Sequence, residues 1–199
     1  SAERYQASIR CSACHSELEG IPPVGHFGAK LKADWMSRLF KGETEQKSRS
    51  WIAARMPAFP AYADQLAIGL SHGYGYSGLS GIHEVIDDEL AKVGRQLISP
   101  VGGFSCVSCH GVGELRPTQV FESEGINFAL SGARLRKDYF RRWILNPLRI
   151  DPLSKMPVYF DEEGMSPLYD VLDGDTDRQL NAIWHYLLQG NDMIPPALE

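Results

Sequence analysis

The chain has 199 residues, which is enough for one or two globular domains, and 43% of them are hydrophobic. Its formal net charge of −5 and its lack of a basic stripe argue against binding to nucleic acid. No apolar run reaches the roughly 18 residues that a membrane-spanning helix needs, so we expect no membrane span in this chain.

The first motif in chain order is Cys-x-x-Cys-His at residues 11–15, and it recurs at residues 106–110. This spacing is typical of covalent c-type haem attachment, in which each thiol adds to one vinyl group of the porphyrin. The adjacent histidine then reaches the iron from the proximal side. The sequence therefore predicts two haem c groups, each with one iron, attached through all four cysteines of the chain: Cys11, Cys14, Cys106 and Cys109.

Three other interpretations of the cysteine pairs are open. A zinc site made from the four cysteines leaves the histidine after each second cysteine unexplained. A thioredoxin-like redox pair should lie in a βαβ setting, and the sequence around the two motifs shows none. A disulfide within each motif would close a loop too small to constrain the unfolded chain much. Haem attachment is the interpretation that accounts for every residue of the motif.

Beyond the cysteine motifs, an internal repeat runs through the sequence. Residues 28–35 match residues 132–139 with four identities in eight positions, and a Met-Pro pair follows in each copy, at 56–57 and 156–157. The cysteine motif, the eight-residue segment and the Met-Pro pair occur in the same order in both copies. The repeat predicts two domains, residues 1–80 and 81–199, joined near a glycine-rich stretch at residues 72–81.

Apolar residues at helical spacing predict helices, and no strand pattern of any length interrupts them. Helices are expected after Asp34 and Asp138 as N-caps, at 61–71, at 87–98 and from 176 to 189, with Asp173 or Asp175 as the last cap. The predicted class is all-α, with two helical domains, each wrapped around an attached haem. Almost no helix is expected before Cys11, which indicates that the first domain is truncated at its N-terminus.

The histidine of each motif, His15 or His110, supplies the fifth ligand of its iron, and methionine is the soft sixth ligand of an electron-transfer haem. Met56 and Met156 are the predicted sixth ligands, because each occurs in its copy of the repeat and a proline fixes the backbone after it. The competing interpretation is that both methionines only fill gaps in a core. Of the other methionines, we expect Met36 in the core and keep as alternative ligands Met165 and Met193.

A proximal histidine usually donates its second ring N–H to a fixed acceptor. We expect that acceptor to be the carbonyl of Pro22 or Pro23 in the first domain and of Pro117 in the second.

On these motifs the chain resembles the class I cytochrome c family, and more closely the tandem-domain dihaem cytochromes c. The likeness is carried by both Cys-x-x-Cys-His motifs, both Met-Pro pairs and the helix at 176–189. It implies a small helical domain around each haem and protein redox partners. The segments at 28–31 and 193–196 also resemble cytochrome modules of larger bacterial dehydrogenase-like proteins, so a fused or associated dehydrogenase is a further expected partner.

The leading function hypothesis is a dihaem carrier that transfers electrons and catalyses no bond-making reaction. The alternative is a dihaem peroxidase-like oxidoreductase with one open or displaceable iron site, which needs a distal acid–base group such as His72, His83 or Glu84. A haem-based sensor is a third. Because haem attachment to paired cysteines takes place in the bacterial periplasm or an equivalent compartment, we expect an exported protein whose signal peptide is absent from these residues.

Overall fold

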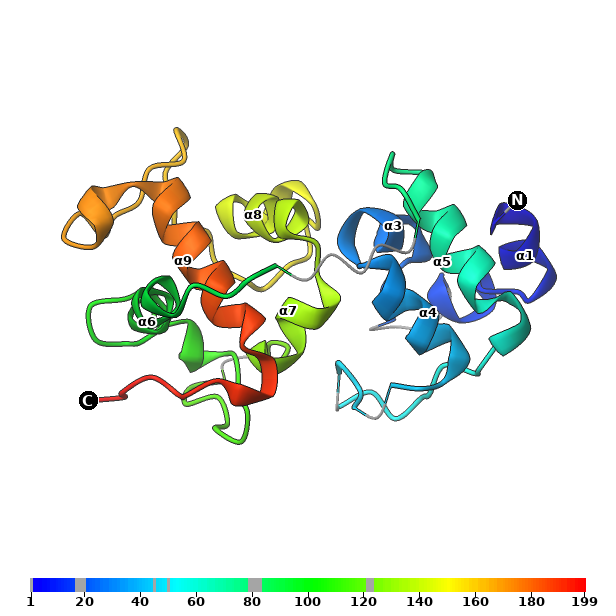
Figure 1. Ribbon diagram of the computed structural model, residues 1–199, viewed down its shortest axis with the longest axis horizontal. Helices are drawn as coiled ribbons and strands as arrows, with labels where there is room; N and C mark the ends of the chain where they lie inside the picture. The colour runs from blue at the N-terminus through cyan, green and yellow to red at the C-terminus, as the bar shows by residue number, and fades with distance from the viewer. Residues whose placement is uncertain (1, 17–20, 45, 50, 79–83, 121–123) are drawn as a thin grey trace. The chain divides into compact units, whose positions relative to one another are not determined.

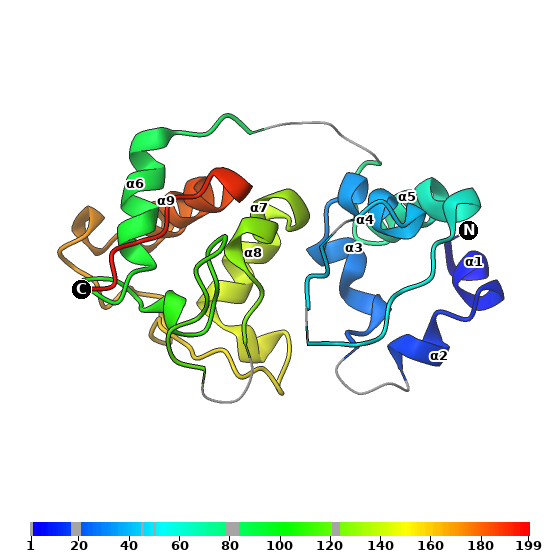
Figure 2. The ribbon, with the colours of Figure 1, turned by 90° about the horizontal axis from the view of Figure 1, so that it is seen from below.

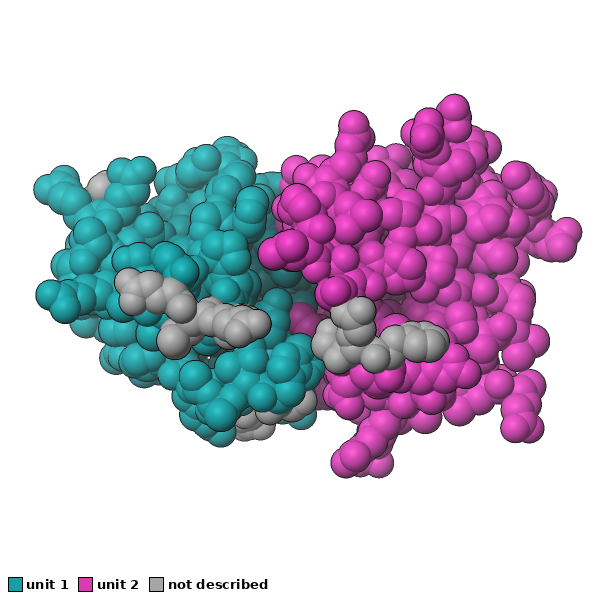
Figure 3. All heavy atoms as spheres, turned by 180° about the vertical axis from the view of Figure 1, so that it is seen from behind, with its two compact units in different colours: residues 1–83, 134–136 teal, residues 84–133, 137–199 magenta. Residues whose placement is uncertain are grey.

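The computed structural model describes residues 2–16, 21–44, 46–49, 51–78, 84–120 and 124–199. In this part of the chain, the regular structure consists of helices and 3-10 turns, with isolated β-bridges and no strand, which confirms the all-α class. None of the described helices is long and apolar enough to cross a membrane. The chain forms two compact units, shown in teal and magenta in Figure 3.

Unit 1 comprises residues 1–83 together with Arg134–Arg136, and unit 2 comprises the remainder. The domain boundary expected after residue 80 falls in residues 79–83, which lie outside the described residues. The elements of unit 1 follow the chain from the blue end of Figure 1: α1 (Ala2–Ser8), α2 (Ser12–His15), the 3-10 turn Val24–His26, α3 (Phe27–Lys30), α4 (Ala33–Lys41), the 3-10 turn Pro60–Tyr62 and α5 (Ala63–His72).

Unit 2 has the longer helices. Its elements are α6 (Asp88–Leu97), α7 (Ser131–Arg134, the last residue of which is grouped with unit 1), α8 (Lys137–Leu145) and α9 (Thr176–Leu188), with 3-10 turns at Cys106–Ser108, Phe128–Leu130, Pro147–Arg149, Leu172–Gly174 and Gly190–Asp192. The expected helices at 61–71, 87–98 and 176–189 are therefore present, each within two residues of its predicted ends.

Two details differ from the sequence-based expectations. A helix, α1, does precede Cys11, and it packs against α5, as Figure 2 shows. Asp34 and Asp138 lie inside the first turns of α4 and α8 and are not the N-caps. A carboxylate in the first turn still interacts favourably with the helix dipole, which explains why the pattern of the sequence looks like a cap.

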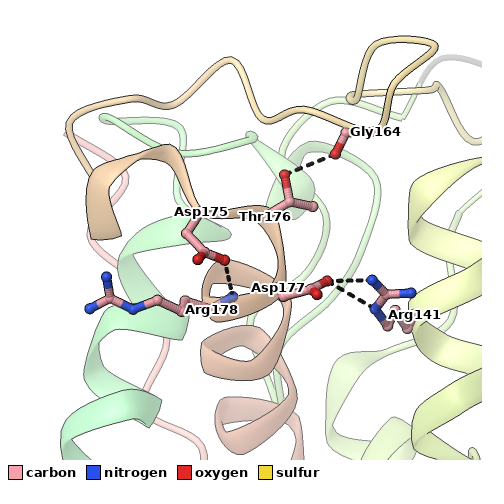
Figure 4. Close-up of polar contacts among 6 residues, drawn as sticks. All are labelled: Arg141, Gly164, Asp175, Thr176, Asp177 and Arg178. Carbon is pink, nitrogen blue, oxygen red and sulfur yellow. Dashed lines mark hydrogen bonds and ion pairs between the residues drawn. The ribbon is translucent and has the colours of Figure 1, made fainter.

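The helix α9 begins after Asp175, one of the two N-caps that the sequence predicts. Asp175 accepts a hydrogen bond from the backbone N–H of Arg178 at 2.9 Å, and the hydroxyl of Thr176 donates to the carbonyl of Gly164 at 2.9 Å (Figure 4). Asp177 forms an ion pair with Arg141 of α8. These contacts attach the long loop before α9 and the helix α8 to the start of α9.

In each unit, helices cross at glycines where a side chain would not fit. A Cβ on Gly94 of α6 would lie 2.1 Å from the carbonyl oxygen of Ala182 in α9, and one on Gly69 of α5 would lie 2.4 Å from the Cβ of Ala2 in α1. The first helix of each unit therefore packs directly on the last. Close backbone approach of this kind is a common reason for glycine inside a helix.

The repeated Gly-Ala segment has the same role in both units. A Cβ on Gly28 of α3 would lie 1.9 Å from the carbonyl oxygen of Leu70 in α5, and one on Gly132 of α7 would lie 2.3 Å from that of Leu187 in α9. In both cases a short helix touches the backbone of the last helix of its unit. The internal repeat in the sequence thus corresponds to a repeated helix contact.

Candidate functional site: two cysteine–histidine motifs and the methionines after them

Both Cys-x-x-Cys-His motifs fold into one helical turn. The backbone N–H of His15 donates to the carbonyl of Cys11 at 3.0 Å, and that of His110 donates to the carbonyl of Cys106 at 3.0 Å. Residues four apart on a helical turn lie on the same side, so the first thiol and the imidazole of each motif share one face. None of the four cysteines forms a disulfide, which contradicts the disulfide interpretation of the motifs.

In unit 1, the ring of His15 is fixed by a backbone acceptor. Its Nδ1 donates to the carbonyl of Pro22 at 2.7 Å. Pro22 is one of the two acceptors that the sequence predicts for this histidine. Since a carbonyl only accepts, the proton is on Nδ1 and the lone pair of Nε2 is left for a metal. The edge of the ring also meets Phe27, with centroids 5.3 Å apart.

In unit 2, the acceptor is different from the expected one. His110 Nδ1 donates to the carbonyl of Ile126 at 2.8 Å, so the expectation for Pro117 is wrong. The ring stacks on Phe128, with centroids 4.5 Å apart, and a Cβ on Gly125 would lie 2.3 Å from the imidazole. Burial lowers the pKa of His110, although the bond to Ile126 opposes this effect. The imidazole is therefore held neutral and oriented.

An apolar cavity in unit 1 brings three predicted haem-binding residues together. It is a small, partly open hollow lined by Cys11, His15 and Met56 and by apolar side chains that include Phe27, Phe40 and Leu66. A thiol, an imidazole and a thioether facing one apolar space are the donors that a covalently attached, hexacoordinate haem requires. The residues present fit the group.

In unit 2, the predicted ligand Met156 lies on a loop that follows α8. Its sulfur Sδ accepts a hydrogen bond from the indole Nε1 of Trp143 at 3.1 Å. Burial raises the pKa of Cys106 to about 12. The ring of Tyr159 meets that of Phe104, two residues before Cys106, with centroids 5.5 Å apart. Burial, with the neighbouring Cys106 and Cys109, raises the pKa of Tyr159 to about 12. The loop that carries Met156 thus passes beside the second cysteine motif.

No family model, curated protein or solved structure matches the chain.

The other methionines occupy different places. Met36 is fully buried in the core of unit 1, as the sequence predicts, whereas half of the Met165 surface is exposed and Met193 is buried in unit 2. Met56 and Met156 remain the predicted sixth ligands.

Two of the three groups proposed for distal acid–base chemistry lie within the described residues. Glu84 accepts a hydrogen bond from the indole of Trp184 at 2.8 Å and lies 3.7 Å from the ammonium of Lys137. His72 is exposed at the end of α5, and His83 lies outside the described residues. Glu84 is thus engaged in contacts within unit 2. It is the carboxylate that the peroxidase-like alternative would use as its acid–base group.

Three features of the site were not predicted. They are the acceptor Ile126, the aromatic rings of Phe27 and Phe128 beside the two histidines, and the indole of Trp143 at the Met156 sulfur. Every residue offers a carbonyl, so nothing in the sequence distinguishes Ile126. Trp143 had a detectable signal, because it is an aromatic residue with an N–H donor on the helix that precedes the repeated methionine.

Among the described residues, no three His, Cys, Asp or Glu side chains gather as a metal-binding group. A zinc site would need four such ligands in one place. The zinc interpretation of the motifs therefore receives no support from the arrangement of the cysteines and histidines.

Proposed function

We propose that the chain is an exported dihaem c-type cytochrome that carries electrons between redox partner proteins. The observation that carries the proposal is the apolar cavity of unit 1, where Cys11, His15 and Met56 face the same space. The sequence repeat extends it to the second site with Cys106, Cys109, His110 and Met156.

When bound, haem supplies a one-electron couple between ferric and ferrous iron. The chain's own residues hold and orient it. Each cysteine thiol adds its S–H across one vinyl group to form a thioether, with no atom lost. His15 presents Nε2 because its Nδ1–H is committed to the carbonyl of Pro22, and His110 does so because of Ile126. Apolar side chains line the first site, and His15 and Met56 would supply both axial ligands of the iron.

We propose a carrier and not an enzyme because an iron with six protein and porphyrin ligands has no open position for a substrate. A carrier accepts one electron per iron from a reduced partner and gives it to an oxidised one, so it needs no open coordination position and no acid–base group. An oxidoreductase of the peroxidase type needs both. Met56 in the unit 1 cavity would occupy the open position, and Glu84 is engaged by the Trp184 indole and the Lys137 ammonium within unit 2.

The test begins with the chain produced in a host that attaches c-type haem. We expect the mass of the denatured protein to include two haem groups, and the ferric visible spectrum to show the weak red band of methionine–iron ligation. Met56→Ala and Met156→Ala should each halve this band. Met165→Ala is the matched control, since its side chain is half exposed on unit 2, and it should leave the band unchanged.

Carbon monoxide distinguishes the two function hypotheses. The ferrous wild-type protein should not bind it at neutral pH, and each methionine variant should bind one equivalent. A chain that attaches no haem contradicts the whole proposal. Binding of carbon monoxide by the wild-type protein contradicts the carrier and favours the peroxidase-like alternative.

A further inference from the structure

The sulfur of Met156 is held by a hydrogen bond from a side chain that the sequence motifs do not include. The indole Nε1 of Trp143 donates to Sδ at 3.1 Å. Trp143 stacks almost parallel to Tyr139, one helical turn earlier in α8, with centroids 6.0 Å apart and an interplanar angle of 16°. Tyr139 is itself buried. The indole is therefore fixed by α8 before it reaches the methionine.

The loop of Met156 is fixed separately by its backbone. The N–H of Met156 donates to the hydroxyl of Ser154 at 3.2 Å, and the N–H of Ser154 donates to the carbonyl of Asp151 at 3.0 Å. The carboxylate of Asp151 accepts from the N–H of Leu153 at 3.0 Å. Side-chain turns of this kind order a loop without help from its surroundings. The indole N–H thus acts on a sulfur that the loop already presents.

The first copy of the repeat has a different residue at this place. In the alignment of the two copies, Trp35 matches Tyr139, and Leu39, one turn later, matches Trp143. Leu39 packs against the core of unit 1, beside which Met56 also lies. A leucine side chain has no polar hydrogen, so it cannot donate to a sulfur. Met156 therefore has an indole N–H donor, whereas the residue that matches Trp143 in the first copy, Leu39, cannot donate to a sulfur.

We propose that Trp143 is a positioning residue that orients the Met156 sulfur and raises the reduction potential of the haem in unit 2, an effect that the matching residue of unit 1, Leu39, cannot supply. This inference rests on the proposed function. A thioether sulfur has two lone pairs, so it can accept from the indole and still bind iron. The positive end of the N–H dipole withdraws electron density from the sulfur and disfavours the additional positive charge of ferric iron, so the ferrous state is stabilised.

The consequence concerns where electrons settle within the molecule. A higher potential in unit 2 favours transfer of one electron from the ferrous iron of unit 1, which becomes ferric, to the ferric iron of unit 2, which becomes ferrous. The full strength of one ordinary hydrogen bond would change this equilibrium constant about fivefold, which is the upper limit, because only the difference in its strength between the two redox states counts. For a one-electron couple this corresponds to about 40 mV, since a tenfold change is about 59 mV.

The experiment is a spectroscopic redox titration of the full haem-loaded chain and of its Trp143→Phe variant. Phenylalanine keeps the ring on Tyr139 but has no N–H. We expect the potential assigned to unit 2 to fall by up to the amount above, the potential of unit 1 to stay unchanged, and the methionine–iron band of unit 2 to shift in position. Trp35→Phe, which changes an indole on the matching helix of unit 1, is the control and should leave unit 2 unchanged. An unchanged unit 2 potential and band in Trp143→Phe would overturn the inference.

A second measurement on the wild-type protein covers the case in which Trp143→Phe does not fold. In the ferrous protein with labelled indole nitrogens, the Trp143 N–H should exchange with solvent much more slowly than that of the half-exposed Trp51. Equally fast exchange overturns the inference. Failure of the proposed function is recognised separately, because Met156→Ala would then leave the spectrum of the protein unchanged, whatever Trp143→Phe does.

Discussion

Gly125 lies against the face of the His110 imidazole, at a distance that leaves no room for a side chain. A Cβ there would come within 2.3 to 2.7 Å of three atoms of the ring. The backbone of Gly125 is also held, because its N–H donates to the carbonyl of Cys109 at 2.7 Å. The glycine therefore cannot move away easily, and the imidazole would have to yield.

From this contact we expect Gly125→Ala to displace His110 and to destabilise unit 2 by about 1–3 kcal/mol, the usual cost of overpacking a filled site. In the haem-loaded protein, the low-spin signal of the second haem should weaken and that of the first should remain. Visible spectra and thermal unfolding measure both effects. Gly25→Ala is the control, because a Cβ at Gly25 meets no atom within 4 Å. Equal spectra for Gly125→Ala and the wild type would contradict this role of Gly125.

At the residue scale, the sequence predicts the groups that carry the chemistry better than those that orient them. The attachment motif fixes Cys11 and His15 by their spacing, and the structure places both beside Met56 in one cavity. The carbonyl of Pro22 was expected because it lies near in sequence, but Ile126 comes from a turn whose path depends on the packing of unit 2. Orientation by backbone groups is a property of the fold, so a residue pattern does not reveal it.

The sequence predicts the long helices but not the short first helix or the helix crossings. Periodicity predicts α5, α6 and α9 to within two residues, because each has an apolar face that covers a core. It does not predict α1, which is only seven residues long and has no buried residue. Helix crossings were also missed, since a glycine in a helical pattern signals a close approach without naming the partner. Gly94 illustrates this, as its partner Ala182 lies far away in the sequence.

The contact between α6 and α9 leads to a prediction at this scale. Alanine favours a helix over glycine by about 1 kcal/mol, so Gly94→Ala would stabilise an isolated α6. In the folded chain, however, its Cβ would lie 2.1 Å from the carbonyl oxygen of Ala182 and 2.9 Å from the side chain of Tyr186. We expect a net loss of about 1–3 kcal/mol in the free energy of unfolding of unit 2, measured by denaturant titration of the haem-loaded protein.

The control for this variant is Gln96→Ala, which changes an exposed position of the same helix and should not destabilise it. A Gly94→Ala protein as stable as the wild type would mean that α6 and α9 are not held at this distance in solution.

On the scale of the whole molecule, the notable property is that each copy of the repeat has its own thiols, histidine and methionine. In unit 1, the cavity, the acceptor Pro22 and the sulfur of Met56 all belong to residues of that unit. In unit 2, His110 and its acceptor Ile126 belong to residues of that unit as well. The duplication inferred from the sequence therefore corresponds to two separate sets of predicted haem-binding groups. Only the three residues Arg134–Arg136 depart from the simple division in chain order.

Since each set is complete, removing the thiols of one motif should leave the other haem attached. We expect the Cys11→Ser/Cys14→Ser chain and the Cys106→Ser/Cys109→Ser chain each to carry one haem, measured as the mass of the denatured protein. Adding Met156→Ala to the first pair should abolish the remaining methionine–iron band, whereas adding it to the second pair should have no effect. Loss of both haems from either double variant would show that the two units do not bind their haems separately.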